Sequence, residues 1–186
     1  MKTILMIILL SVTATFVHAQ NKWTIDKGHS SVRFEVGHMF ISTVAGSFKR
    51  FSGSIVDKNG SFEGGTINTE IEVGSVSTDN DSRDSHLKSS DFFDASQFPV
   101  IIFESTSIQK LDNKNYRIEG NLTMRGVKKP ITLEAALGGI TTVGGTTKAG
   151  FKARSTINRM DFGVSGGGSM VGDSIEIEIN IELTKT

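Results

Sequence analysis

The segment Ser174 to Leu183, SIEIEINIEL, alternates apolar and polar residues without a break. Isoleucine or leucine occupies every second position, and three glutamates and Asn180 stand between them. Successive side chains of a strand point to opposite faces, so the segment predicts a strand with one apolar and one solvated face. The apolar face must meet either the chain's own side chains or a bound molecule, and that choice decides what the protein can do.

Seven further segments read as strands, and turn-rich stretches of glycine and asparagine separate them. They are residues 31–36, 51–56, 66–73, 100–105, 116–124, 131–137 and 149–157. The 186 residues include 20 glycines but only 2 prolines, which suits many strands joined by tight turns. Short strands at regular spacing predict a single antiparallel sandwich or barrel.

Two segments depart from this pattern. Residues 82–89 are polar and predict about two turns of helix, with Asp79 or Asp81 as the N-cap. Residues 38–46, HMFISTVAG, are compatible with a short helix or with a loop. The sequence therefore predicts one or two short helices beside the strands.

The first residues have the features of a secretory signal. Lys2 precedes an apolar run over residues 4–17, which is shorter than the roughly 20 residues that span a bilayer. We expect cleavage after Ala19, which makes residues 1–19 a signal peptide and residues 20–186 the mature domain. The alternative is an uncleaved N-terminal anchor, which the short run and the lack of a following basic cluster disfavour.

Charge and cysteine content exclude several classes of protein. The chain has 20 basic and 20 acidic residues, so no excess of positive charge is available for nucleic acid. There is no cysteine, which excludes a disulfide framework and a lipid-modified N-terminal cysteine. Stability must then come from a hydrophobic core.

One sequence motif indicates an enzyme. GVSGG, residues 163–167, fits the hydrolase pattern G-x-S-x-G around Ser165. That pattern needs a following helix and a downstream histidine, whereas glycines follow Ser165 and every histidine precedes it. These glycines have two other interpretations, an anion-binding nest and a plain hairpin connection. The histidines also lack metal-site spacing, so we expect no metal site.

The densest group of functional side chains lies in residues 82–93, SRDSHLKSSDFF. Charged groups beside aromatic residues suit the mouth of an apolar pocket, where the polar end of a ligand would stop. A capped helix with solvated charges explains the same residues. Arg125 and Arg159 carry the same ambiguity, because each could bind an anion or pair with a carboxylate.

Small residues recur on the apolar faces of the strands. A closed barrel of eight strands is filled by its own side chains or holds one small ligand. Gly53, Gly120, Ala135, Ala153 and Ser155 are in phase with larger apolar residues. If they face one another, they leave a lumen, although glycine in a strand also marks bends and bulges.

Several of these segments together resemble the YceI-like polyisoprenoid-binding family. The similar stretches are WTIDKGHSSVRFEVGHM, GSFKRFSG, SVSTDNDSRDSHLKSSDFFDASQFPVIIFES, IEGNLTMRGVKKPITL and AGFKARSTINRMDFGV. The most specific part is R-D-x-H-L followed by F-F-D and x-F-P. The glycine-rich SGGGSMVGD before the last strand departs from the family pattern.

The resemblance implies an all-β protein, an antiparallel eight-stranded lipocalin-like barrel around an elongated tunnel. It implies that the tunnel holds an isoprenoid lipid, either a polyprenyl phosphate or an isoprenoid quinone, for transport or storage. No cofactor and no catalysis are expected. The residues that we expect to contact the head group at the tunnel mouth are Arg83, Asp84, His86, Arg125 and Arg159. For the tunnel lining we predict Phe34, Val36, Ile71, Phe92, Phe103, Gly120, Leu122, Leu133, Ala135, Phe151, Ala153, Ile177 and Ile179.

Two other functions remain as alternatives. One is a hydrolase that uses Ser165 or the pair of Asp84 and His86. The other is a β domain with a solid core that acts only through its surface. For the lipid-binding hypothesis we expect a periplasmic or secreted protein whose partners are the lipid and, transiently, a membrane surface. A homodimer is left open, and nucleic acid is not expected.

Overall fold

The computed structural model describes residues 20–58 and 60–186, and the expected signal peptide, residues 1–19, lies outside them. These residues form strands, one α-helix and three short 3-10 helices. The strands are β1 (Gln20–Ile25), β2 (Ser31–His38), β3 (Ser42–Phe48), β4 (Phe51–Lys58), β5 (Ser61–Glu72), β6 (Val76–Ser77), β7 (Val100–Lys110), β8 (Asn115–Met124), β9 (Val127–Val143), β10 (Thr146–Asn158) and β11 (Val171–Lys185). The helices are α1 (Asp81–Lys88), η1 (Val73–Ser75), η2 (Arg159–Phe162) and η3 (Gly168–Met170).

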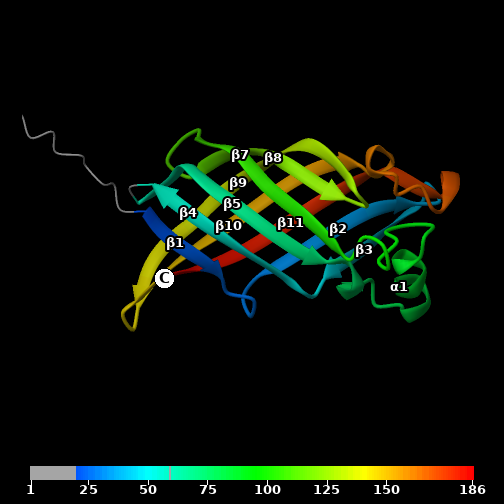
Figure 1. Cartoon of the computed structure of the whole chain (residues 1–186), viewed down its shortest axis with the longest axis horizontal. Coiled ribbons are helices and arrows are strands. Elements are labelled where there is room, and N and C mark those ends of the chain that lie inside the picture. Colours follow the sequence, from blue (N-terminus) through cyan, green and yellow to red (C-terminus); the bar gives the residue numbers. More distant parts are fainter. Residues whose placement is uncertain (1–19, 59) are drawn as a thin grey trace, which may run out of the picture.

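Eight strands close into an antiparallel barrel, in the order β1-β4-β5-β7-β8-β9-β10-β11, and β11 completes the ring by pairing with β1 (Figure 1). The fold class predicted from the alternating segments and the family resemblance is thereby confirmed. The long alternating segment forms most of β11, and its isoleucines point into the barrel. Its apolar face therefore meets the interior of a closed ring rather than a second sheet.

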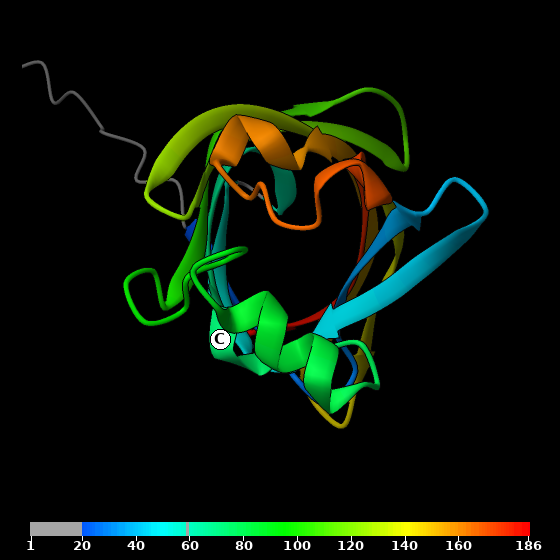
Figure 2. The ribbon, with the colours of Figure 1, turned by 90° about the vertical axis from the view of Figure 1, so that its right-hand side faces the viewer.

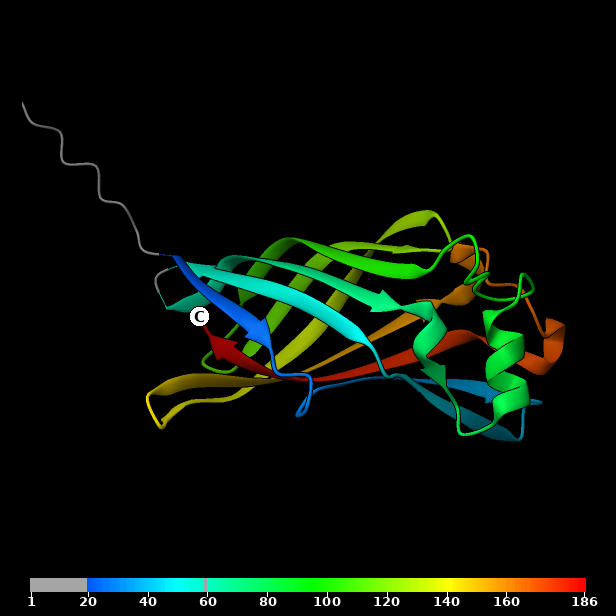
Figure 3. The same cartoon turned by 60° about the horizontal axis from the view of Figure 1, so that its bottom comes forward.

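Three short strands lengthen one side of the barrel. Strand β11 pairs with β2 over residues 171–180 and with β1 over residues 183–185, so β2 continues the path of β1 after a break. In the same way β3 leads into β4, and β6 follows β5 and pairs with β3. These extensions all lie at the end of the barrel that carries α1 (Figure 3).

An ion-pair cluster holds the break between β1 and β2. The carboxylate of Asp26 bonds the His29 ring at 3.0 Å and the Lys148 ammonium at 3.1 Å. These bonds lower the pKa of the Asp26 carboxyl from its ordinary value of 3.8 to about 2. Lys148 also donates to Glu182, so its ammonium group lies between the carboxylates of Asp26 and Glu182. These two carboxylates and His29 are close enough to bind a cation together, but the lysine already supplies positive charge there.

The one α-helix agrees with the prediction to within one residue, but its cap does not. Asn80 is the N-cap, and its side chain accepts a hydrogen bond of 2.9 Å from the Arg83 amide. Asp79 lies outside the helix with a φ of +57°, and Asp81 is the first helical residue, so neither serves as the cap. The described residues contain no helix that is both long enough and apolar enough to cross a bilayer.

The alternative of a second helix over residues 38–46 is wrong. Residues 42–48 form β3 and pair with β2 from Ser42 opposite His38 to Phe48 opposite Val32. This pairing satisfies the backbone polar groups along the facing edges of the two strands and places Phe48 in the core. Residues 39–41 make the tight connection between the two strands.

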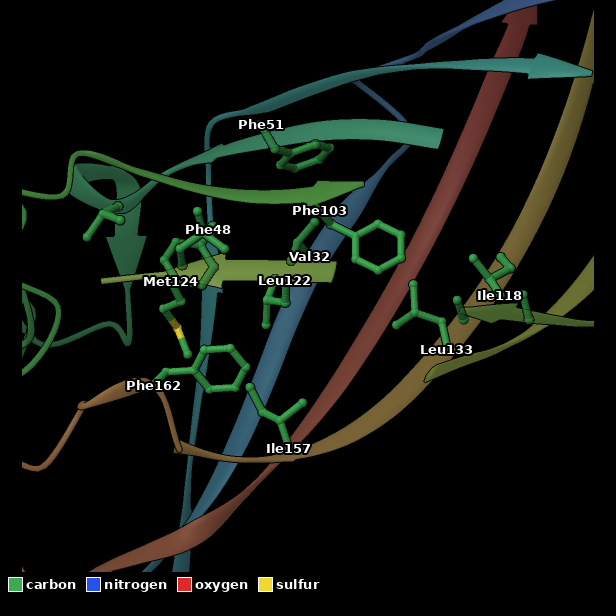
Figure 4. Close-up of a cluster of buried hydrophobic side chains, with 14 of the residues drawn as sticks. Val32, Phe48, Phe51, Phe103, Ile118, Leu122, Met124, Leu133, Ile157 and Phe162 are labelled. Atoms are coloured by element: carbon green, nitrogen blue, oxygen red, sulfur yellow. The ribbon is translucent and has the colours of Figure 1, made fainter. Parts of the chain in front are cut away.

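Buried apolar side chains from all around the ring point inward (Figure 4). In the view of Figure 4, Phe103, Leu122 and Leu133 extend from different strands toward a shared interior. The large residues of the apolar faces therefore form a wall, as expected from their phase in the sequence.

Candidate functional site

The barrel encloses an elongated apolar cavity of about 230 Å³. Side chains of nearly every strand line it, together with Leu87 of α1 and Phe92 and Phe93 of the following loop. The lining is almost entirely carbon, and two arginines touch it. Arg33 is exposed, and Arg159 donates its hydrogen bonds to the protein. A cavity of this character can bind an apolar chain.

Aromatic rings close the cavity at the end opposite α1. Trp23 lies 5.3 Å from Phe62 between ring centroids, Phe62 lies 4.8 Å from Phe151, and Phe151 lies 5.9 Å from Tyr116. The indole of Trp23 donates a 2.8 Å hydrogen bond to the fully buried carboxylate of Asp57, which fixes the ring in place. The cavity consequently has one sealed end.

The opposite end, which we refer to as the mouth in keeping with the sequence prediction, is covered by α1, residues 89–99 and the glycine-rich segment (residues 163–172). Figure 2 looks onto this end and shows α1 on one side of the rim and the segment from η2 to η3 on the other. A Cβ on Gly166 would lie 2.5 Å from the Phe92 ring, so the glycine lets the two loops close together. The glycine-rich segment is therefore part of the closure of this end.

Most of the residues predicted for the tunnel line the cavity. The structure brings together on its wall Phe34, Val36, Ile71, Phe92, Phe103, Leu122, Leu133, Ala135, Phe151, Ala153, Ile177 and Ile179. Ala135 and Ala153 stand opposite each other on β9 and β10, as small residues that leave room in the lumen would. Contact with a lipid remains a prediction for all of them.

Gly120 does not line the cavity, and the reason is a ring from the next strand. A Cβ on Gly120 would lie 2.4 Å from Cζ of Phe103 and 2.6 Å from the Glu104 carbonyl oxygen. Gly53 is covered in the same way, with the Asn68 carbonyl and the Thr69 methyl both at 2.7 Å. These glycines admit neighbouring atoms of the wall, so they do not contribute open space.

Two of the residues predicted at the mouth, Arg83 and Asp84, instead bind one loop residue. Both the amide and the hydroxyl of Thr78 donate to the Asp84 carboxylate, at 2.8 and 2.6 Å. The Arg83 guanidinium donates to the Thr78 hydroxyl at 2.7 Å and to its carbonyl at 2.8 Å. Asp84 is buried and holds the turn before α1, whereas Arg83 stays exposed.

His86 and Arg125 lie against the loop that carries Phe92. The His86 ring bonds the Asp91 carboxylate at 2.9 Å and stands edge-on to Phe92, with centroids 5.0 Å apart. Arg125 donates to the carbonyl of Phe92 and, at 2.8 Å, to that of Ser90. Both side chains therefore position the aromatic cover of the mouth.

Arg159 organises the glycine-rich segment. It is 3% exposed, and its guanidinium donates to the carbonyls of residues 164, 166, 168, 171 and 172 and to the Asp173 carboxylate. A guanidinium has five N–H donors, and these bonds use all of them. The geometry thus favours a structural role for Arg159 over a contact with a head group.

Ser165 shows no catalytic arrangement. It is exposed in the glycine-rich segment, and the helix that follows it, η3, has only three residues. Within residues 20–58 and 60–186, no hydrogen bond joins it to a histidine, and His29 and His86 bond Asp26 and Asp91. The strand-turn-helix elbow and the base that hydrolase chemistry requires are not formed by these residues.

Several cavity residues had no distinct signal in the sequence. Phe62 was missed because β5 begins five residues before the predicted strand, at Ser61. Phe48 and Phe93 line the mouth with ring centroids 5.9 Å apart, although they come from segments far apart in the chain. Only the packing of the loop after α1 against β3 places these rings together.

Comparisons with known proteins extend over nearly the whole described chain. A family model described as the YceI-like domain matches residues 23–183. Protein YceI of Salmonella newport is 36% identical over 177 residues, which cover 94% of this chain and 91% of that protein. A crystal structure of the YceI protein of Campylobacter jejuni is 33% identical with a TM-score of 0.72, covering 88% of this chain and 97% of that one. A structure described as a polyisoprenoid binding domain from Saccharophagus degradans has the same fold at 15% identity, with a TM-score of 0.65 over 87% and 97% of the two chains.

Proposed function

Because the chain belongs to the YceI-like domain family, we propose that it binds a long isoprenoid lipid inside its barrel and catalyses no reaction. The observation that carries the proposal is the apolar cavity inside the barrel, whose lining is almost entirely carbon. The name of the Saccharophagus domain supports isoprenoids as the ligand class. An apolar cavity inside a barrel suits an apolar chain better than a polar molecule.

We infer the direction of binding from the aromatic end of the cavity. The isoprenoid tail enters through the mouth and runs toward the aromatic plug of Trp23, Phe62, Phe151 and Tyr116, so its head group stays near α1. Of the arginines predicted to meet that head group, Arg83 and Arg125 each direct two N–H groups at protein acceptors and keep others available. A phosphate head group would bind them rather than Arg159.

The energetics suit a carrier or a store. Burial of apolar surface contributes about 0.8 kcal/mol per CH₂ relative to water, so an isoprenoid tail strongly prefers the cavity to solvent. A bilayer interior is as apolar as the cavity wall, so the net preference over a membrane is small. The protein can therefore accept the lipid and release it again. With the expected signal peptide, this exchange takes place outside the cytoplasm, in the periplasm or the medium.

The test is a titration with geranylgeraniol and geranylgeranyl phosphate, followed by displacement of a fluorescent apolar probe from the cavity. We expect both to displace the probe with one site per chain. Arg83→Gln together with Arg125→Gln should weaken binding of the phosphate at least about tenfold more than binding of the alcohol, a difference of roughly 1.4 kcal/mol. Failure of both ligands to displace a bound probe would refute isoprenoid binding.

A further inference from the structure

The turn between β2 and β3 exposes three consecutive apolar side chains. Met39, Phe40 and Ile41, which we call the hairpin tip, are 49%, 93% and 85% exposed. Residues 36–42 and 167–172 carry no Lys, Arg, Asp or Glu. Such a cluster on a projecting turn marks an interaction site in a soluble protein.

The residues of the hairpin tip are unfavourable for the turn that they form. Met39 and Phe40 have φ values of +52° and +63°, and the Ile41 amide bonds the His38 carbonyl at 3.2 Å. Two consecutive positive φ values favour Asn and Gly, because other side chains crowd the backbone there. Two other tight turns of the described residues have glycine in at least one of these positions, at Arg125-Gly126 and at Gly144-Gly145. A large apolar pair at this turn therefore does not serve the turn itself.

The hairpin tip is continuous with the mouth of the cavity. The Met39 amide donates to the Met170 carbonyl at 2.8 Å, and Met170 is itself 56% exposed. One residue further on, Val171 pairs with His38 and lines the cavity, as does Val36. Figure 2 shows the β2–β3 hairpin reaching outward from the rim at the end that carries α1. An apolar path thus runs from the lumen to the outermost turn.

We propose that the hairpin tip and Met170 insert into the surface of a lipid bilayer and set the cavity mouth against it. The delivery of an isoprenoid at this contact rests on the proposed function, whereas the membrane contact itself does not. Four exposed side chains fall far short of the 1,200–2,000 Å² that stable protein interfaces bury, so a second protein is a poorer fit than a fluid surface. The uncharged tip makes insertion depend on apolar burial rather than on anionic lipid.

The first experiment is flotation of the purified protein with phosphatidylcholine vesicles, with and without phosphatidylglycerol. We expect a fraction of the protein to float with both, and the fraction to be the same at low and high salt. The variant Met39→Asn with Phe40→Gly should lose about tenfold or more in partitioning. Its thermal midpoint should stay the same or rise, because Asn-Gly suits the positive φ values. A folded protein with less membrane binding is a result that a purely structural turn would not give.

The matched control is Leu111→Asn with Val143→Asn, which removes exposed apolar side chains at the opposite end of the barrel. These residues are 49% and 67% exposed, and their variant should float like the wild type. The proposal is overturned if the tip variant floats like the wild type, if binding disappears at high salt, or if the wild type does not float. It is also overturned if the tip instead mediates a concentration-dependent dimer.

A separate assay keeps this proposal distinct from the proposed function. The tip variant should bind geranylgeraniol in vesicle-free solution with the affinity of the wild type, but accept it from vesicles about tenfold more slowly. Vesicle binding without any geranylgeraniol binding would refute the proposed function and leave the membrane contact standing. Geranylgeraniol binding without vesicle binding would refute the membrane contact and leave the proposed function standing.

Discussion

Replacing Ala153 with phenylalanine distinguishes a hollow barrel from a filled one by the sign of the stability change. Ala153 is 8% exposed, lines the cavity and faces Ala135 across the ladder between β9 and β10. A cavity of about 150 Å³ lined by apolar side chains admits benzene, and this cavity is about 230 Å³. A phenyl ring therefore fits into existing space.

The expected magnitude follows from burial. Burying a phenylalanine side chain contributes about 1.5–3 kcal/mol relative to exposing it, and partial burial in the unfolded chain reduces this by roughly 10–40%. The lipid-free variant should thus gain about 1–2 kcal/mol in the free energy of unfolding. In a filled core, the same substitution would cost about 1–3 kcal/mol through strain.

Urea unfolding of lipid-free protein measures this difference, with Ala136→Phe as the control. Ala136 is the neighbour of Ala135, is exposed on the outer face and pairs with Lys152, so its substitution should be close to neutral. Ala153→Phe should also weaken geranylgeraniol binding at least about tenfold. A loss of more than about 1 kcal/mol in stability with unchanged binding would refute the hollow barrel.

Three further substitutions test individual contacts. Arg159→Met should lower the free energy of unfolding by at least about 3 kcal/mol, because several buried carbonyls lose their donor; unchanged stability in urea would contradict the structural role. In Gly46→Ala, the added Cβ would lie 2.3 Å from the Phe34 ring and should push that ring into the lumen. Binding of geranylgeraniol, measured by probe displacement, should then weaken about tenfold. The control Gly37→Ala, whose added Cβ has nothing within 4 Å, should not weaken it. The Asp26 carboxylate, with its pKa of about 2, stabilises the fold above pH 4, and this contribution is lost as the pH falls toward 2. Asp26→Asn should therefore flatten the dependence of the thermal midpoint on pH in that window, and an unchanged slope would show that this ion pair does not stabilise the fold.

The strands could be predicted from the sequence because a period of two marks a one-sided strand whatever it pairs with. The inward phase of β11 follows from that period alone, and so does that of large wall residues on other alternating strands, such as Phe34 and Leu133. The glycines could not be interpreted in the same way. Gly120 is covered by Phe103 only because of the register between β7 and β8, which no local pattern specifies.

The arginines show a second reason why part of the site could not be predicted from the sequence. A sequence identifies a donor but not its acceptor, and the acceptors of Arg159 and Arg125 are backbone carbonyls of loops. Carbonyls have no signature in the residue types. The hairpin tip could not be predicted because HMFISTVAG is compatible with a short helix or with a loop. Only the pairing of β2 with β3 shows that a hairpin forms there.

The most direct test of the lipid-filled barrel is mass spectrometry of the organic-solvent extract of the protein, purified without detergent from a bacterium that exports it. Isoprenoid binding predicts a single class of prenyl lipid at close to one molecule per chain, and markedly less from Ala153→Phe. An extract that contains no prenyl lipid, or the same amount from both proteins, would contradict it.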